Sequence, residues 1–273
     1  MYRALAVAVL LVVAGCNAPT GDSSTDAATV TPVAVPETTA TPRHPGRLAP
    51  GVTDEGVVDP GRLVRTHEAR LSATTYTVNQ TLVRRDDNGT VRSRYVTRAR
   101  FAAEPGRFRA VVRQADRENG TLVVRYDERF GDGDRAYAAE DTGNGTEYRL
   151  MRYPGGGPRD PEGVYFRNLT NRDAIGRLFT LADTEPVGTF TEDGTRFVRL
   201  RSPEPTAIPP LRNVTLTATV SERGVVRSYR VEYDVTRDGA VATTVAVSYT
   251  GVGTTTVERP AWVDRVNATA TPA

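Results

Sequence analysis

The sequence predicts a mainly β (α+β) fold: a long-stranded, curved antiparallel sheet, or half-open β-barrel, with one or two helices covering its concave face. From Thr74 onward, apolar and polar residues alternate with a period of two, which is typical of half-buried strands. Two segments depart from this alternation and repeat their apolar residues at helical spacing. Turn signals separate runs of about 8 to 14 residues, longer than the usual five or six residues of a strand. Such long strands favour a strongly twisted sheet over a small sandwich.

The N-terminus has the pattern of an export signal. Arg3 precedes Ala4–Ala14, an uncharged run too short to span about 30 Å of hydrocarbon but suited to the apolar region of a signal peptide. Val13-Ala14-Gly15-Cys16 resembles a lipobox, and Cys16 is the only cysteine of the chain. We therefore expect a signal peptide over 1–15 and a lipid on Cys16, with a secreted protein carrying a chance cysteine as the alternative.

The next segment, 16–55, is predicted to be a disordered tether. Thr, Pro and Ala make up 19 of the 34 residues in 17–50, and this stretch has no aromatic residue and no apolar periodicity. Such a segment buries too little surface to offset its ordering entropy. His44 lies within it and receives no role.

Seven of the nine asparagines begin an Asn-X-Thr sequon, far more than chance predicts. Three of the seven read Asn-Gly-Thr, which also favours a hairpin turn. We therefore expect an exported, glycosylated protein. The candidate glycosylation sites are Asn79, Asn88, Asn119, Asn144, Asn168, Asn213 and Asn267.

A first helix is predicted over about 60–72, where the folded domain (56–266) begins. Asp59-Pro60 has the form of an N-cap followed by proline at the first helical position. The apolar face that follows consists of Leu63, Val64, His67 and Leu71. A single histidine on such a face is interpreted as a core-boundary residue and not as a ligand.

Antiparallel strands are expected on both sides of a second helix. The turn signals that separate the strands lie at 86–89, 104–106, 118–120, 142–145, 192–194, 222–224 and 237–239. Thr170–Asp173 resembles a capping box, Ile175, Leu178, Phe179 and Ala182 form an apolar stripe, and Pro186 is expected to end this helix. Residues 267–273 are predicted to be a flexible tail.

Aromatic residues on the apolar strand faces, with the apolar stripe of the second helix, are candidates to line a ligand cavity. Ordinary core packing is the alternative interpretation of the same pattern. The candidate cavity residues are Tyr95, Phe101, Tyr126, Phe130, Ile175, Phe179, Tyr229 and Tyr233.

Arginines dominate the polar faces of the first strands. They could meet phospholipid headgroups or an anionic glycan, or they could pair with carboxylates on neighbouring strands. The set comprises Arg84, Arg85, Arg92, Arg94, Arg98, Arg100, Arg107, Arg109, Arg113 and Arg117.

We find no candidate catalytic, cofactor-binding or metal-ligating residues, and we expect no enzyme. One Cys and two His cannot build a four-ligand Cys/His zinc site. The loop at 155–157 lacks the remainder of a phosphate-binding motif, and Asp132-Gly133-Asp134 lacks the spacing of an EF-hand. A carboxylate pair acting on glycans stays open as a minor alternative. The net charge of +2 demands no nucleic acid partner.

Together, the lipobox, the Thr/Pro tether, the short first helix, the long strands and the single central helix resemble the LolA/LppX superfamily of lipoprotein carriers. The C-terminal stretch Thr255–Val263 also resembles the ending of uncharacterised haloarchaeal lipoproteins of that fold. The resemblance covers about 57–266. It implies a half-open β-barrel whose apolar concavity holds lipid or acyl chains, and it implies no catalytic residues. Trp262 is expected to pack over the rim.

The predicted function is that of a membrane-anchored extracytoplasmic lipoprotein that binds a lipid or other apolar ligand in the sheet. Its partners would be the membrane, through Cys16, and a lipid. The alternative is an interaction or sensor lipoprotein whose arginine-rich face contacts an envelope protein or glycan. We expect a monomer and no cofactor.

Overall fold

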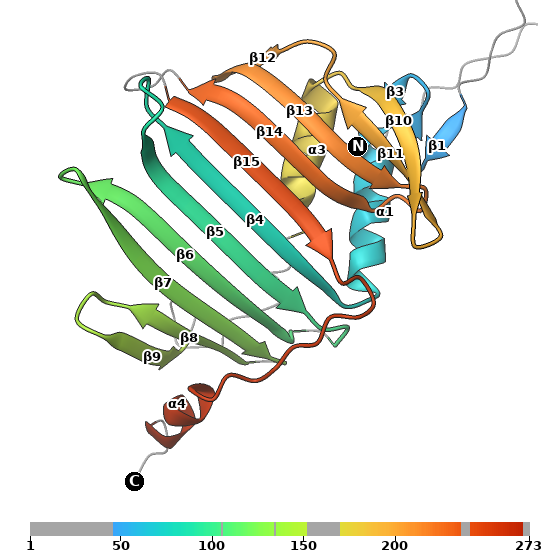
Figure 1. Ribbon diagram of the computed structural model, residues 1–273. Coiled ribbons are helices and arrows are strands. Elements are labelled where there is room, and N and C mark those ends of the chain that lie inside the picture. The colour runs from blue at the N-terminus through green and yellow to red at the C-terminus, as the bar shows by residue number, and fades with distance from the viewer. Residues whose placement is uncertain (1–45, 105, 134, 152–169, 236–240, 270–273) are drawn as a thin grey trace, which may run out of the picture. The chain divides into compact units, whose positions relative to one another are not determined.

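The computed structural model describes residues 46–104, 106–133, 135–151, 170–235 and 241–269, all within the compact unit His44–Ala273. Its main feature is a twelve-stranded antiparallel sheet (Figure 1). The strand order is β10-β11-β13-β14-β15-β4-β5-β6-β7-β8-β9, with β12 paired to β13. Within the described residues, the edge strands β10 and β9 do not pair with each other, so the sheet stays open. The predicted fold class is confirmed.

The strands are long, as the sequence predicts. They are β4 (Tyr76–Arg85), β5 (Val91–Phe101), β6 (Phe108–Glu118), β7 (Thr121–Asp132), β8 (Arg135–Asp141), β9 (Thr146–Leu150), β10 (Glu185–Glu192), β11 (Thr195–Arg201), β12 (Thr206–Ile208), β13 (Leu211–Ser221), β14 (Val226–Val235) and β15 (Val241–Thr250). Six of the seven predicted turns lie between successive strands, and the one at 237–239 lies outside the described residues.

Two meanders build this sheet. Strands β4 to β9 pair in sequence order, and so do β13 to β15, with β10 and β11 at the far edge. The meanders join where β15 pairs with β4, from Ala242 opposite Arg85 to Thr250 opposite Thr77. The first and last long strands therefore lie side by side in the middle of the sheet (Figure 1).

The first helix, α1 (Pro60–Ser72), begins and ends as predicted. The Asp59 side chain accepts a hydrogen bond from the Arg62 backbone N–H at 2.8 Å, and Pro60 occupies the first turn. All four residues of its predicted apolar face are buried.

The second predicted helix, α3 (Arg172–Leu181), has a different start and end from those expected. Asn171 is the N-cap residue but makes no side-chain cap, because its amide donates to the Tyr249 hydroxyl at 3.2 Å. Pro186 does not terminate the helix: the chain is already extended at Ala182, and Pro186 lies in β10. Proline has no backbone N–H, and an edge strand tolerates it because a backbone position that faces away from the sheet needs no donor.

The folded domain begins earlier than the predicted boundary at residue 56. β1 (Arg47–Ala49), β2 (Val52–Thr53) and β3 (Gly56–Val57) form a small antiparallel sheet. Ala49 and Val52 are fully buried, so burial of apolar surface outweighs the low structural propensity of this end of the predicted tether.

Both helices pack on one face of the large sheet, which we call the helix-side face (Figure 1). On β4 this face carries Tyr76, Val78, Leu82 and Arg84, which alternate along the strand. On the neighbouring strands it carries the residues paired with them. The main buried cluster includes Leu63, Leu71, Tyr76, Val78, Ala99, Phe101, Phe108, Ala110, Ile175, Phe179, Tyr229, Val247 and Tyr249. Packing here is close: a Cβ atom on Gly131 would lie 2.4 Å from the Phe108 ring.

A second cluster lies on the opposite face, where the C-terminal segment and α4 (Val263–Thr269) cover part of β7, β8 and β9. Its buried members are Phe130, Tyr137, Val257, Val263 and Val266. Trp262 stacks on Tyr148 with ring centroids 5.8 Å apart, and Arg259 pairs with Asp132 at 2.7 Å. The expected flexible tail thus begins within a helix, since α4 extends to Thr269.

Candidate functional site

The helix-side face changes character along the strands. In β4, Tyr76 and Val78 are fully buried, Leu82 is half-buried, and Arg84 is exposed. In β5, Phe101 is likewise buried and Tyr95 half-buried. The proximal half of this face, near α1, is therefore packed core, whereas the distal half carries half-buried apolar side chains.

Half-buried apolar side chains of the distal half come from five adjacent strands. Leu82 pairs with Tyr95 on one side and with Val245 on the other. Alternation places Val112 of β6 and Tyr233 of β14 on the same face. We call these five residues the distal floor: Leu82, Tyr95, Val112, Tyr233 and Val245.

Polar groups border the distal floor on its β6 side. Gln114 lies opposite Tyr95 in the register, and its amide donates to the Tyr95 hydroxyl at 3.0 Å. The same amide donates to the Asp116 carboxylate. The phenol of Tyr95 therefore marks the boundary between apolar and polar surface.

A cavity of about 550 Å³ opens where the distal floor ends, and we call it the distal cavity. Neighbouring strands contribute through direct register: Thr243 lies opposite Arg84, Arg84 opposite Ser93, and Ser93 opposite Asp116. The lining residues are Arg84, Asp86, Arg92, Ser93, Asp116, Arg117, Val235, Val241 and Thr243. Sequence reasoning missed this site. The available signal was the alternation in β5, which puts Ser93 and Tyr95 on one face, and Arg84 of β4 lies opposite Ser93.

The structure brings six of the eight predicted cavity residues to the helix-side face. Four of them, Phe101, Tyr229, Ile175 and Phe179, are buried in the core, as the alternative interpretation had it. Only Tyr95 and Tyr233 are half-buried and lie on the distal floor.

Tyr126 and Phe130 were wrongly assigned to the inner face. They lie opposite Arg113 and Arg109 and therefore share the opposite face of the sheet. The Tyr126 hydroxyl donates to Glu128 at 3.1 Å, and Phe130 is buried under the C-terminal segment. Most apolar residues of β7 lie on the face that the C-terminal segment partly covers, whereas Arg125, Asp127 and Arg129 lie on the helix-side face. Alternation identified the apolar face of this strand but could not show which side of the sheet it faces.

His67 is a buried structural residue. Its Nε2–H donates to the Thr170 carbonyl, and its Nδ1 accepts from the Val226 N–H, both at 3.2 Å. Its ring meets Tyr249 edge-on at 4.9 Å. Burial lowers the pKa of His67 to about 4, so the imidazole is neutral at pH 7. Both nitrogens are occupied within the protein, and no cluster of three metal-ligating side chains occurs in the described ranges.

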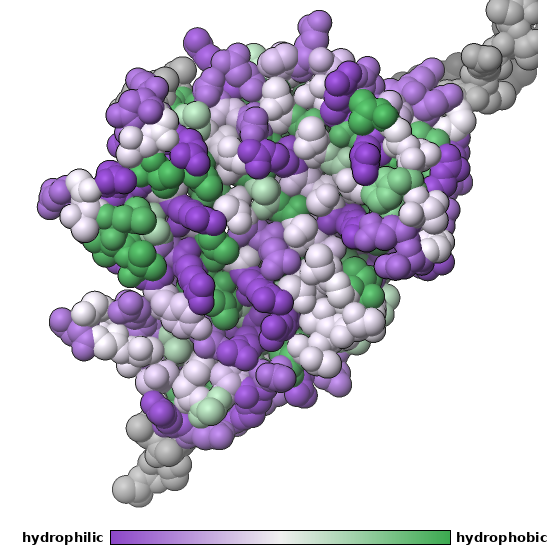
Figure 2. Space-filling model, viewed as in Figure 1, coloured by the Kyte–Doolittle hydropathy of each residue, from purple (hydrophilic) through white to green (hydrophobic). Residues whose placement is uncertain are grey.

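Only part of the arginine set pairs with carboxylates. Arg109 contacts the buried Glu128 at 2.6 Å, and Arg107 contacts Glu104 at 3.7 Å. Arg113 lies 6.0 Å over the Tyr126 ring. The exposed Arg94 and Arg98, and the half-buried Arg100, have no ion pair in the part of the chain that the structure describes. Figure 2 shows this face, with hydrophilic side chains in rows across the middle of the sheet.

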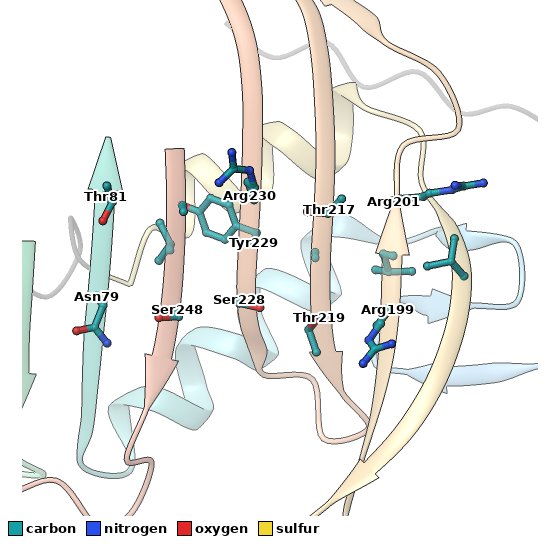
Figure 3. Close-up of a pocket in the computed structure, with 15 residues that line it drawn as sticks. Asn79, Thr81, Arg199, Arg201, Thr217, Thr219, Ser228, Tyr229, Arg230 and Ser248 are labelled. Carbon is teal, nitrogen blue, oxygen red and sulfur yellow. The ribbon is translucent and has the colours of Figure 1, made fainter. Parts of the chain in front are cut away.

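A second hollow of about 480 Å³, the outer groove, lies on the same face as Arg94 (Figure 3). Small side chains of β4, β13, β14 and β15 form its base, among them Thr81, Thr217, Ser228 and Ser248. Its arginines are engaged: Arg201 pairs with Glu185 at 2.9 Å, Arg230 donates to Glu232, and Arg199 lies 4.5 Å from the centroid of Phe190.

Several candidate glycosylation sites lie at accessible positions. Asn88, Asn119 and Asn144 are exposed at turns between strands. Asn79 is half-buried in β4 at the outer groove, and exposed Asn213 donates to Asp234 at 2.7 Å. Outside the described residues lie the predicted signal peptide 1–15, Cys16, His44, the loop at 155–157, Asn168 and the side chain of Asn267.

No helix in the described ranges is long and apolar enough to cross a bilayer.

Comparisons with known proteins find solved structures of low sequence identity to this chain. No family model matches the chain, and no curated protein matches it. LprF from Mycobacterium bovis is 14% identical, with 74% of this chain and 96% of that one covered and a TM-score of 0.38. A LolA superfamily protein from Nitrosomonas europaea is 7% identical, covering 72% of this chain and 93% of its own, with a TM-score of 0.27. A putative outer membrane lipoprotein-sorting protein domain from Vibrio parahaemolyticus is 6% identical, covering 74% and 95%, also at a TM-score of 0.27. Similarities this distant assign neither a family nor any residue role to the chain.

Proposed function

We propose that this protein is an extracytoplasmic lipoprotein, anchored to the membrane through Cys16, that binds a lipid on the helix-side face of its sheet. The anchor rests on the lipobox and on the position of the only cysteine. A dialkyl anchor is far stronger than a single acyl chain, since each buried methylene contributes about 0.8 kcal/mol. The protein acts as a carrier or sensor of its ligand and has no catalytic role.

The distal floor is the observation that carries the lipid-binding role. Its five side chains are half-buried, whereas residues of the same strands nearer α1 are fully buried. Five adjacent strands at about 4.8 Å spacing extend roughly 19 Å, which is long enough to contact an acyl chain. The surface ends at a polar cavity, and this combination suits an amphiphile.

Native mass spectrometry tests the proposal on the full chain, purified gently from a membrane-containing host. We expect a co-purifying lipid that solvent extraction releases. Val112→Gln places an amide on the distal floor and should reduce lipid occupancy. Val111→Gln is the matched control, since Val111 is also half-buried but faces the other side of β6. An unliganded mass that persists after polar lipids are added would overturn the proposal.

A second candidate function rests on the unpaired arginines of the opposite face. Arg94, Arg98 and Arg100 present positive charge without carboxylate partners in the described residues, which suits an anionic envelope glycan. Retention of the full chain on an immobilised anionic polysaccharide should then fall steeply with salt. Arg94→Gln with Arg98→Gln should abolish that retention, and unchanged elution of this variant would exclude the second function.

A further inference from the structure

We propose that the distal cavity binds a phosphate group, which, if the proposed lipid binding is correct, is the headgroup phosphate of the lipid lying on the distal floor. The charges that line the cavity and one buried hydroxyl favour a phosphate there.

The two carboxylates of the cavity are already engaged. Asp86 accepts the backbone N–H of Thr90 at 2.8 Å. Asp116 accepts from Gln114 and lies 3.7 Å from the guanidinium of Arg125, which is outside the cavity lining. Their negative charge is therefore partly compensated by groups that a ligand would not displace.

Two of the three cavity arginines remain available. Arg117 donates to the carbonyls of Val91 and Gly120, at 3.2 and 2.6 Å. The side chains of Arg84 and Arg92 make no hydrogen bond or ion pair within the described ranges. The donors left for a ligand thus carry positive charge, which favours an anion over a cation.

A bulge explains why Arg92 belongs to this cavity and not to the arginine rows of the opposite face. Arg84 pairs with Ser93, whereas Arg85 pairs with Val91, so Arg92 has no Cα partner in β4. Such an irregularity redirects side chains, and Arg92 lines the distal cavity beside Ser93.

Thr243 is the independent observation that points to a ligand in this cavity. Its side chain is only 2% exposed, and its Oγ1 has no hydrogen-bond partner in the part of the chain described. Buried hydroxyls are nearly always paired, because an unpaired one is destabilising. Thr243 lines the cavity and lies directly opposite Arg84 in the register. A phosphate oxygen there would accept from the hydroxyl and from the guanidinium together.

Calorimetric titration of the full chain, delipidated by solvent extraction, tests this assignment. The probes are inorganic phosphate, a short-chain phosphatidic acid below its micellar concentration, and the diacylglycerol of the same chain length. We expect phosphatidic acid to bind at least tenfold more tightly than diacylglycerol. Arg84→Gln with Arg92→Gln should remove that preference, and Arg94→Gln with Arg98→Gln, on the opposite face, should retain it.

Thr243→Val provides a second variant that keeps the fold. It replaces the unpaired hydroxyl with a methyl group of similar size, so the melting temperature should not fall, while affinity for phosphatidic acid should drop severalfold. Equal binding of both lipids to the wild type would overturn the phosphate site and leave lipid binding intact. Binding of inorganic phosphate alone, lost in the Arg84/Arg92 variant, would support the site and refute lipid binding. Absence of binding by all three probes would refute both.

Discussion

The proximal and distal halves of the helix-side face are built by the same strands, yet the apolar side chains of one are fully buried and those of the other are only half-buried. In the proximal half, Tyr76 stacks on Phe101 at 4.8 Å, and Phe101 lies 5.9 Å from Phe108. In the distal half, Leu82 and Tyr95 are only half-buried, and a cavity follows them. The alternation of the strands fixes which way a side chain points, whereas the helices packed on the sheet decide whether it is buried.

Truncating a large side chain in each half should give the largest contrast. Ile175 of α3 is fully buried, so Ile175→Ala should lower the free energy of unfolding by about 2–5 kcal/mol. Leu82→Ala should cost about 1 kcal/mol, because less contact is lost at a half-buried position. Chemical denaturation of both variants measures this difference, and equal losses would mean that the distal half is as tightly packed as the core.

Acid should weaken the proximal half through His67. Its folded-state pKa of about 4 lies below the ordinary histidine pKa of 6.5, so the unfolded chain binds the extra proton between these values. Stability from this residue is present above pH 6.5 and is lost as the pH falls toward 4, by about 3 kcal/mol in total. Denaturation across this range should show the slope, and His67→Gln should flatten it. A slope that survives the substitution would locate the effect elsewhere.

Enlarging a side chain should also destabilise the proximal half more than the distal half, but by less than the truncations do. Gly131→Ala places a methyl group against the Phe108 ring and should destabilise the protein by about 1–3 kcal/mol. Val112→Ile adds one methyl group to the distal floor, where we expect a change within about 0.5 kcal/mol. Thermal unfolding resolves the two, and a comparable loss for Val112→Ile would show that the distal floor has no spare room.

Removing an unpaired hydroxyl should have the smallest effect on stability. Tyr76 Oη, like Thr243 Oγ1, is buried without a partner in the described residues. Tyr76→Phe should therefore leave the melting temperature unchanged or slightly raised, and it should not alter lipid binding. Thermal unfolding and lipid titration of this variant test both statements. Reduced lipid affinity in Tyr76→Phe would extend the binding site into the proximal half.

The sequence predicts most of the fold because its local signals agree with each other. Asp59-Pro60 fixes the start of α1, and the alternation in β5 separates Tyr95 and Phe101 from the arginines correctly. The assignment fails at β7, where the C-terminal segment buries Phe130 on the face that alternation treats as inner. A contact between segments so far apart in the chain leaves no local pattern.

The distal cavity could not be predicted in the same way. It depends on a bulge that redirects Arg92 and on the register that places Thr243 opposite Arg84. Neither the position of a bulge nor a register between distant strands follows from a period of two. Sequence reasoning therefore located the apolar face and missed the polar group of residues at its end.

The pairing of β15 with β4 sets the order in which this protein can fold. Thr77 and Thr255, which share a hydrogen bond at 3.0 Å beside this pairing, are 178 positions apart. Each meander can form from contacts between neighbours in the chain, but the union of the two must wait until the last long strand is available. During synthesis, which starts at the N-terminus, β4 would be an unpaired edge strand until β15 is made, and it could then pair with a wrong strand. We therefore expect closure of the β4–β15 seam to be slow and sensitive to aggregation, and a truncation that removes β15 would leave both meanders with unprotected edges.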